Sequence, residues 1–288
     1  MLAAFWTIAF AVIASIAFSS SYAHADTLSS PNGKKVIETS GKLVKKKGSV
    51  YYKYKKVVTS SDNSSKVSKK TKGKTKTAKG FFLQKGKKSY YFDKKGKMAT
   101  GWIKIGSDYY FFNRSNGVQS KGTKKRKAVV DKIKIRKDGK AVKTKYNVEK
   151  IKVMMKARKV MLANTKYTDS KATKRLKMFR WVMKGNYRQF RTLKSTGHRK
   201  GWELLFANDM FDKNRLGCCV SNASAFAFLA KECGYKDVRI CDDTGHAFVM
   251  INGKYFDTLF AEVNGFHNYY NAPHSRARKD FLANSLKI

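Results

Sequence analysis

Residues 217–223 read GCCVSNA, and the segment that continues from them, VSNASAFAFLAKECGY at 220–235, has apolar residues at helical spacing. One face of this predicted helix holds mainly small residues and suits close packing on a sheet; it comprises Cys219, Ala223, Phe226, Ala230 and Cys233. Cys219 lies at the amino end, where unpaired backbone N–H groups and the helix dipole favour a thiolate. We therefore predict a buried helix that carries a nucleophile, with Cys219 rather than Cys218 in that role.

The residues after this helix predict a strand and then a β-hairpin. DVRIC at 237–241 is typical of a short strand, and DTGHAFVMINGKYFDTLF at 243–260 predicts a hairpin that turns at Asn252-Gly253. In that register His246 and Asp257 share one face as diagonal neighbours, about 7–8 Å apart along the backbone. Asp257 can then orient the imidazole of His246, whose other nitrogen takes the proton of the thiol.

The four cysteines also allow structural roles. Two disulfides would silence the site, but Cys219 and Cys233 stand near opposite ends of one helix, about 21 Å apart, and cannot bridge. A zinc site of three cysteines and His246 lacks any CxxC spacing. We favour catalysis over both, and we expect no metal and no cofactor. The remaining histidines with no partner pattern are expected at the surface; they are His198, His267 and His274.

In combination, these motifs resemble the transglutaminase-like superfamily over residues 200–260. The matching segments are Gly217-Cys218-Cys219-Val220-Ser221-Asn222-Ala223, Gly245-His246-Ala247-Phe248 and Gly253-Lys254-Tyr255-Phe256-Asp257. The resemblance implies a papain-like α+β domain in which the cysteine-bearing helix packs on an antiparallel sheet. It also implies acyl transfer through a thioester on Cys219, with His246 and Asp257 as partners. Some relatives use an upstream aromatic donor to the oxyanion, and Trp202 is the candidate, with core packing as the alternative.

A repeat of 21 residues precedes this domain. GFFLQKGKKSYYFDKKGKMAT at 80–100 is followed by GWIKIGSDYYFFNRSNGVQSKG at 101–122. An aromatic residue follows each leading glycine, Phe81 in the first unit and Trp102 in the second, and an aromatic doublet follows in each, Tyr90-Tyr91 and Tyr109-Tyr110. Short aromatic strands separated by glycine turns at a fixed period predict hairpins that stack on one another.

The two units resemble the cell-wall-binding repeats of choline- and glucan-binding proteins of Gram-positive bacteria. The matching segments are G-W-I-K-I-G-S-D-Y-Y and G-K-M-A-T-G, with Phe81 in place of the usual Trp. The resemblance implies that aromatic rings bind a wall polymer, because a quaternary amine or a sugar face lies well against them. We name Tyr91, Trp102 and Tyr110 as candidate ligand-binding residues, with hairpin packing as the alternative role.

These patterns divide the chain into four segments. Residues 1–25 contain a long apolar run that ends in Ala23-His24-Ala25, which is typical of a cleaved signal peptide, with an uncleaved anchor as the alternative. Residues 26–79 are rich in Lys, Ser, Thr and Gly and are interpreted as a basic, solvated linker. Residues 80–142 form the hairpin repeats, and 147–288 form the transglutaminase-like domain.

The net charge of +44, from 63 Lys+Arg against 19 Asp+Glu, predicts a polyanionic partner. Three quarters of this excess lies in residues 26–159. A secreted chain rarely meets nucleic acid, so we expect an anionic wall polymer, with contact to a membrane only through an uncleaved leader. The named candidates are teichoic acid, choline and glucan.

The sequence as a whole indicates a secreted, wall-associated thiol acyl-transfer enzyme of α+β class. Its substrate is a protein or peptide, and the thioester is resolved by water or by an amine. A non-catalytic wall-binding or adhesion protein with a vestigial domain is the alternative. A Cys-His-His endopeptidase is disfavoured, because that class expects no acidic partner at Asp257.

Overall fold

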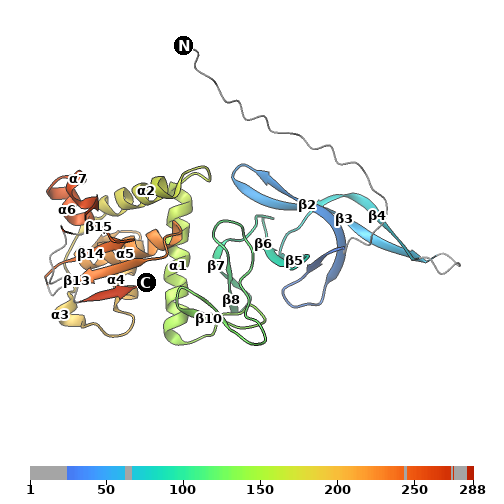
Figure 1. Cartoon of the computed structure of the whole chain (residues 1–288), viewed down its shortest axis with the longest axis horizontal. Helices are drawn as coiled ribbons and strands as arrows, with labels where there is room; N and C mark the ends of the chain where they lie inside the picture. The colour runs from blue at the N-terminus through green and yellow to red at the C-terminus, as the bar shows by residue number, and fades with distance from the viewer. Residues whose placement is uncertain (1–24, 62–66, 243–244, 274, 276–283) are drawn as a thin grey trace, which may run out of the picture.

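The structure is a computed structural model that describes residues 25–61, 67–242, 245–273, 275 and 284–288. A β-rich N-terminal part and a mixed α+β C-terminal part lie on opposite sides of the long helix α1, Lys145–Asn164 (Figure 1). The coarse α+β class is thus confirmed. The predicted signal peptide lies outside the described residues, apart from Ala25.

Four strands of a six-stranded antiparallel sheet lie in the segment predicted as a linker. The order of the sheet is β4-β3-β2-β1-β5-β6. The strands are β1 Asp26–Ser29, β2 Val36–Lys46, β3 Ser49–Ser61, β4 Val67–Thr77, β5 Phe81–Lys85 and β6 Lys88–Phe92. The linker prediction for 26–79 is therefore wrong. Tyr52 and Tyr54 alternate with lysines along β3, so the rings enter a small core while the lysines remain in solvent.

The hairpins of the two repeat units align in a different register from the predicted one. β5–β6 and β7–β8 (Gly101–Ile105 and Asp108–Phe112) each turn through two residues, Gly86-Lys87 and Gly106-Ser107. Counting back from these turns, Phe82 opposite Tyr91 corresponds to Trp102 opposite Phe111. Phe82, not Phe81, therefore occupies the position of the tryptophan. A third hairpin joins β9 Ala128–Val130 to β10 Ile133–Ile135.

The C-terminal part places the cysteine-bearing helix α5, Cys219–Glu232, against a five-stranded sheet. The strand order is β16-β15-β14-β13-β17, with antiparallel neighbours. The strands are β13 Val238–Asp242, β14 Ala247–Ile251, β15 Lys254–Phe256, β16 Tyr270–Ala272 and β17 Ser285–Lys287. The hairpin turns at Asn252-Gly253, as predicted. Its ladder ends at Val249 opposite Phe256, because Asp257 leaves the strand to begin a helix.

The remaining elements surround this unit. They are α2 Lys171–Met183, β11 Asn186–Tyr187, α3 Leu193–Thr196, α4 Trp202–Phe211, β12 Leu216–Gly217, α6 Thr258–Val263 and α7 Phe266–Tyr269. Every residue of α5 is buried, since α1, α2, α4 and the sheet all pack against it. Among the described residues, no helix is both long and apolar enough to cross a bilayer.

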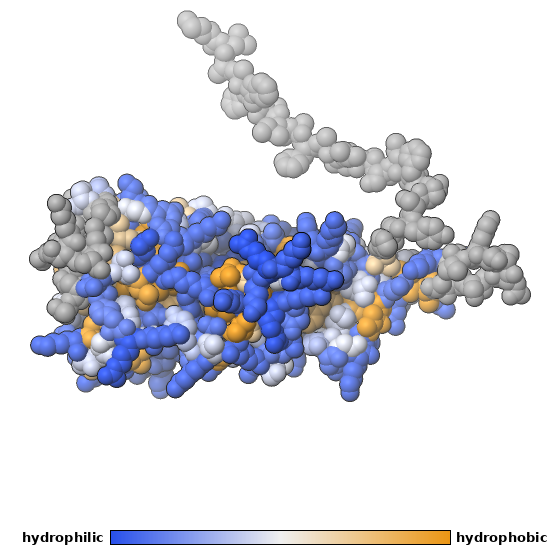
Figure 2. Space-filling view, turned by 60° about the horizontal axis from the view of Figure 1, so that its bottom comes forward, coloured by the Kyte–Doolittle hydropathy of each residue, from blue (hydrophilic) through white to orange (hydrophobic). Residues whose placement is uncertain are grey.

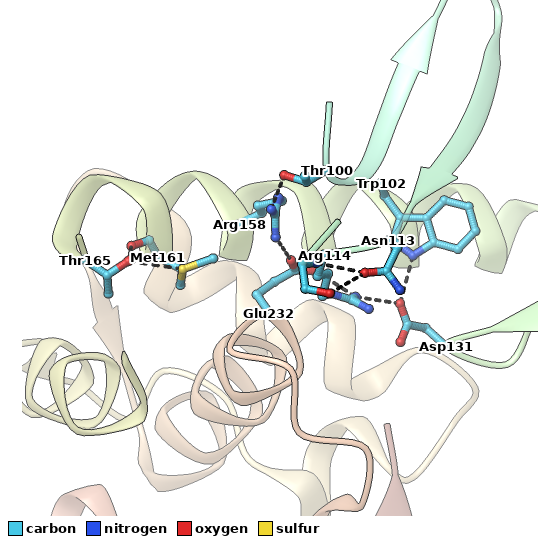
Figure 3. Close-up of polar contacts among 10 residues, drawn as sticks. Thr100, Trp102, Asn113, Arg114, Asp131, Arg158, Met161, Thr165 and Glu232 are labelled. Atoms are coloured by element: carbon cyan, nitrogen blue, oxygen red, sulfur yellow. Dashed lines mark hydrogen bonds and ion pairs between the residues drawn. The ribbon is translucent and has the colours of Figure 1, made fainter. Parts of the chain in front are cut away.

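One hydrophobic core is shared by the repeats and the α+β part. It includes Trp102 and Phe111 of the second hairpin, Ile133 and Ile135 of the third, and residues of α1, α2, α4 and α5. A buried polar network, which we call the Glu232 cluster, lies at the same junction (Figure 3). Its members are Trp102, Arg114, Asp131, Arg158, Lys231 and Glu232.

The Glu232 cluster ties the end of α5 to the hairpins. Arg158 donates to one oxygen of Glu232 at 2.9 Å, and Arg114 donates to the other at 2.8 Å. Arg114 also donates to the carboxylate of Asp131 at 2.7 Å. The same carboxylate accepts the indole N–H of Trp102 at 2.9 Å. The carboxylate of Glu232 is fully buried, so these partners compensate its loss of water. The hairpins and the α+β part are thereby held as one packed unit.

Candidate active site

The two adjacent cysteines stand at the start of α5. Cys218 is the N-cap residue, with extended backbone, and Cys219 is the first helical residue. Gly217 is required before them, because a Cβ at this position would lie 2.4 Å from the Cβ of Ser221. The chain therefore enters the helix in close contact with its first turn. Both thiols are buried, with residue exposures of 3% for Cys218 and 8% for Cys219.

His246 is held in one orientation by two neighbours. Its Nε2 donates to Oδ2 of Asp257 at 2.5 Å. Phe260 stacks flat on the imidazole, with ring centroids 4.1 Å apart and planes 9° apart. Because Nε2 is bound to the carboxylate, Nδ1 is the nitrogen that can accept a proton from a thiol.

The two carboxylate oxygens of Asp257 accept hydrogen bonds from different groups at the end of the hairpin. Its Oδ2 accepts from the hydroxyl of Tyr255 at 2.8 Å, in addition to His246. Its Oδ1 accepts the backbone N–H groups of Leu259 and Phe260 at 3.1 and 3.0 Å, which caps α6. The carboxylate is thus fixed by the same residues that fix the imidazole.

The thiol of Cys219 reaches the strand that follows His246. The backbone of Ala247, the first residue of β14, lies within hydrogen-bonding reach of this thiol and lowers its pKa, against larger opposing causes. The structure therefore brings the start of α5, the start of β14 and the end of β15 to one place. Cys219, His246 and Asp257 are the predicted residues at those three ends.

The two adjacent thiols shift each other's pKa in opposite directions. The hydrogen bond with Cys219 is the main cause that lowers the pKa of Cys218 to about 6, and the Ser221 and Val220 backbones contribute, against burial. The same hydrogen bond, followed by burial, raises the pKa of Cys219. The pair thus releases its first proton more readily than an ordinary thiol, with the negative charge favoured on Cys218.

The thiol of Cys218 contacts a backbone carbonyl and a serine hydroxyl. Its Sγ lies 3.7 Å from the carbonyl oxygen of Arg191 and 3.7 Å from Oγ of Ser221. Ser221 donates to Asp209 at 2.9 Å, and burial raises the pKa of Asp209 to about 6. These contacts make Cys218 part of a polar chain behind the helix start, whereas Cys219 faces the strand that carries the histidine.

The remaining cysteine alternatives do not match the structure. All four cysteines are free thiols, so none is locked in a disulfide. Burial raises the pKa of Cys233 and of Cys241 to about 12 in each case, which makes these two thiols unreactive at neutral pH. Among the described residues, no group of three or more His, Cys, Asp or Glu side chains is arranged to hold a metal ion.

Trp202 begins α4 and is buried in the main core. Its ring packs edge-on against Phe206 and against His198, with centroids 6.2 and 5.3 Å apart. These contacts match the core-packing alternative.

A second imidazole–carboxylate pair was missed from the sequence. His198, expected as a surface residue without a partner, donates from Nε2 to Oδ1 of Asp242 at 2.6 Å. The only available signal was an aspartate directly after the apolar strand of 237–241, where a buried carboxylate needs a partner. The partner lies 44 residues upstream, so no local pattern could identify it.

An aromatic cluster lies between the first and second hairpins. Phe82 contacts Tyr91 and Tyr110, with centroids 5.0 and 5.6 Å apart, and Phe112 completes the cluster. Phe82 is partly exposed, whereas the other three rings are buried. Tyr91 and Tyr110 therefore pack the hairpins together while their rings border a partly exposed aromatic.

The predicted ligand role of Trp102 is not compatible with its environment. The indole is 2% exposed, packs against Phe111 at 5.2 Å and donates to Asp131. The third hairpin and α1 pack against the hairpin that carries Trp102 and cover its ring. Trp102 thus belongs to the junction between the two parts of the molecule.

Comparison with known proteins identifies one family in the chain. The sequence profile of the choline-binding repeat matches residues 78–123. The chain therefore carries choline-binding repeats. Proteins with such repeats are secreted and associated with the cell wall, which confirms the predicted location. No curated protein matches the chain.

Three solved structures from Streptococcus pneumoniae are similar to parts of the chain. The choline-binding domain of Spr1274 is 25% identical over 23% of this chain and 86% of that chain, with a TM-score of 0.19. CbpJ is 21% identical over 38% of this chain and 39% of that chain, with a TM-score of 0.20. Choline-binding protein F is 25% identical over 39% of this chain and 36% of that chain, with a TM-score of 0.19. With TM-scores this low, we draw nothing on the fold from them.

Proposed function

We propose that the protein is a wall-associated thiol acyl-transfer enzyme of transglutaminase-like type, with a papain-like catalytic core. One observation carries the proposal: an imidazole fixed by a buried carboxylate at 2.5 Å directly precedes the residue whose backbone meets the Cys219 thiol. A thiol at a helix start, a histidine and an orienting carboxylate form the arrangement that nucleophilic catalysis requires. All three come from elements packed around one helix.

The chemistry follows from these roles. The thiolate of Cys219 attacks an amide carbonyl, and His246, protonated by the thiol, passes that proton to the leaving amine as the C–N bond breaks. The backbone N–H of Cys219 at the helix start stabilises the oxyanion. Water or a second amine then attacks the thioester, the C–S bond breaks, and the proton returns to sulfur. Asp257 holds the imidazole throughout.

The repeats are proposed to hold the enzyme at choline groups of wall polymers. The partly exposed ring of Phe82, bordered by Tyr91 and Tyr110, offers aromatic faces to a quaternary amine. Figure 2 shows a mainly hydrophilic surface with small, separated hydrophobic areas, and the net charge is +44. Such a surface attracts an anionic polymer strongly at low salt.

The decisive experiment compares Cys219→Ala with Cys218→Ala. Each variant is incubated with a glutamine-containing donor and a labelled amine, and then with wall peptides, and incorporation and cleavage are measured. We expect Cys219→Ala to lose both activities and Cys218→Ala to retain turnover. The reverse result would reject Cys219 as the nucleophile, and wild-type protein inactive in both assays would reject the proposed activity.

A non-catalytic wall-binding protein is the second candidate. It is favoured by the exposure of the Cys219 residue, only 8%, and by a family match that covers only the repeats. Thiol reactivity separates the two candidates. A catalytic pair reacts with iodoacetamide well below pH 8, whereas a vestigial one reacts as an ordinary buried thiol.

A further inference from the structure

His198 is held in place and still reaches solvent. Its Nε2 donates to Asp242 at 2.6 Å, and Trp202 packs edge-on against its ring. The Asp242 side chain is 1% exposed, whereas that of His198 is 47% exposed. The loop that carries His198 connects α3 to α4, between Gly197 and Gly201. The imidazole is therefore oriented by a buried carboxylate while one edge faces the solvent.

This second pair lies next to the proposed nucleophile. Asp242, the last residue of β13, pairs across the sheet with Ala247. Ala247 follows His246 and meets the thiol of Cys219. Strand alternation places Asp242 on the face of Val238 and Ile240, which pack in the core with α5. The two imidazole–carboxylate pairs thus lie at the adjoining ends of two neighbouring strands, β13 and β14.

The presence of a histidine at this position bears on the role of the pair. A histidine is the side chain that both accepts and releases a proton near neutral pH. With Nε2 on the carboxylate, Nδ1 is the nitrogen that can exchange protons with a ligand.

We propose that His198, positioned by Asp242, is the base that prepares the acyl acceptor in the second half of the reaction, a role that rests on the proposed function. The acceptor is a neutral nucleophile with an O–H or N–H bond, either water or an amine. Its proton passes to Nδ1 of His198 as its oxygen or nitrogen bonds to the thioester carbonyl. The C–S bond then breaks and leaves the thiolate of Cys219. The proton on His198 is released to the solvent, from which the Cys219–His246 pair regains one proton.

The two histidines therefore serve different half-reactions. His246 takes part in forming the thioester, and His198 is needed only for its resolution. Loss of His198 should leave acylation intact and trap the acyl-enzyme. A residue with only a structural role would slow both half-reactions together.

The test is the burst kinetics of the full chain with a p-nitrophenyl acyl ester. We expect His198→Ala to keep the rate and amplitude of the nitrophenol burst and to lower the steady-state rate by about 100-fold or more, the usual contribution of a general base. Intact mass spectrometry should show the acyl adduct accumulating on Cys219. Free imidazole should restore the steady-state rate of His198→Ala with saturation. The matched control is His267→Ala, an exposed histidine on α7.

The outcomes separate the two proposals. An unchanged steady-state rate in His198→Ala, or an equal fall in burst and steady state without imidazole rescue, overturns the role of His198 alone. Wild-type protein without any burst overturns the acyl-transfer function, and the role of His198 with it. Thermal unfolding of each variant checks that the substitution of the half-exposed His198 leaves the fold intact.

Discussion

At the scale of single residues, the adjacent thiols set the reactivity of the site. The hydrogen bond between the two thiols lowers the pKa of Cys218 and raises that of Cys219, and backbone contacts in the first turn of α5 favour the ionised form of both. Cys219 faces the strand of His246, and Cys218 faces the chain of Ser221 and Asp209. The two sulfurs thus lie in different surroundings and carry opposite pKa shifts.

This arrangement predicts the pH dependence of alkylation. We expect the iodoacetamide rate of the wild type to rise through an inflection near pH 6, because the pair ionises with a pKa of about 6. In Cys218→Ala the inflection should move to higher pH, since the hydrogen bond between the thiols is gone. The rate is measured by mass spectrometry from pH 4 to 10.

Cys233 and Cys241 serve as internal controls in the same experiment. Burial raises the pKa of each thiol to about 12, so neither should be modified at pH 7. A wild-type inflection near pH 8.5, the value of an ordinary cysteine, would contradict the lowered pKa of the Cys218–Cys219 pair.

Cys219, His246 and Asp257 stay the predicted catalytic residues; the sequence predicted the pairing of His246 with Asp257 but not the electrostatics of the two thiols. Cys219, His246 and Asp257 follow from helix and hairpin periodicity, which are local patterns. The hydrogen bond between the thiols of Cys218 and Cys219 depends on how the two side chains point at the start of the helix. The pair of His198 and Asp242 joins residues 44 positions apart across a sheet end, so no local pattern contains it.

At the scale of elements, Asp257 joins the hairpin to the short helix α6. It ends β15, caps α6 through Oδ1 and binds His246 and Tyr255 through Oδ2. The predicted hairpin register was correct up to Phe256, and the cap explains why the ladder stops there. The orientation of the imidazole therefore depends on the formation of α6.

This dual role predicts different effects for two substitutions. Asp257→Ala loses the cap and leaves buried donors unpaired, so the free energy of unfolding should fall by about 3 kcal/mol. Asp257→Asn retains the cap and should cost about 1 kcal/mol, while the acylation rate still falls because the imidazolium loses its negative partner. Urea unfolding and burst kinetics measure the two effects. Equal stability losses in both variants would contradict the capping role.

The linker prediction failed at this same scale. Composition alone indicated a solvated segment over residues 26–79, since lysine, serine and threonine dominate it. The strand form depends on partners: Tyr52 packs with Leu28, Leu83 and Phe92 and donates its hydroxyl to Asp26 at 2.7 Å. Burial of alternate residues against distant strands was therefore sufficient to order a highly charged segment.

At the scale of the whole molecule, the Glu232 cluster joins wall-binding and α+β parts. Arg114 comes from the second hairpin, Asp131 from the third, Arg158 from α1 and Glu232 from the end of α5. The sequence predicted the choline-type repeats and the coarse α+β class. The shared core of the two parts could not be predicted, because it depends on pairs as distant as Arg114 and Glu232, 118 residues apart.

The cluster predicts that the two parts unfold together. Glu232→Gln removes the negative charge between two arginines, and we expect the free energy of unfolding to fall by about 3–5 kcal/mol. The matched control is Glu149→Gln, which breaks an exposed pair with Lys152 and should cost less than about 0.5 kcal/mol. Calorimetry should show one transition in the wild type. Two separate wild-type transitions would contradict the shared core.

The burial of Trp102 against α1 and the Glu232 cluster has a geometric consequence for work on a polymer. Under the proposed function, the packed junction between the aromatic cluster and the thiol fixes the distance from a bound choline to the bond that reacts. Modified sites along a wall strand should therefore fall at a fixed interval from the anchoring residue. The spacing of the products, rather than their amount, would then record the dimensions of the enzyme.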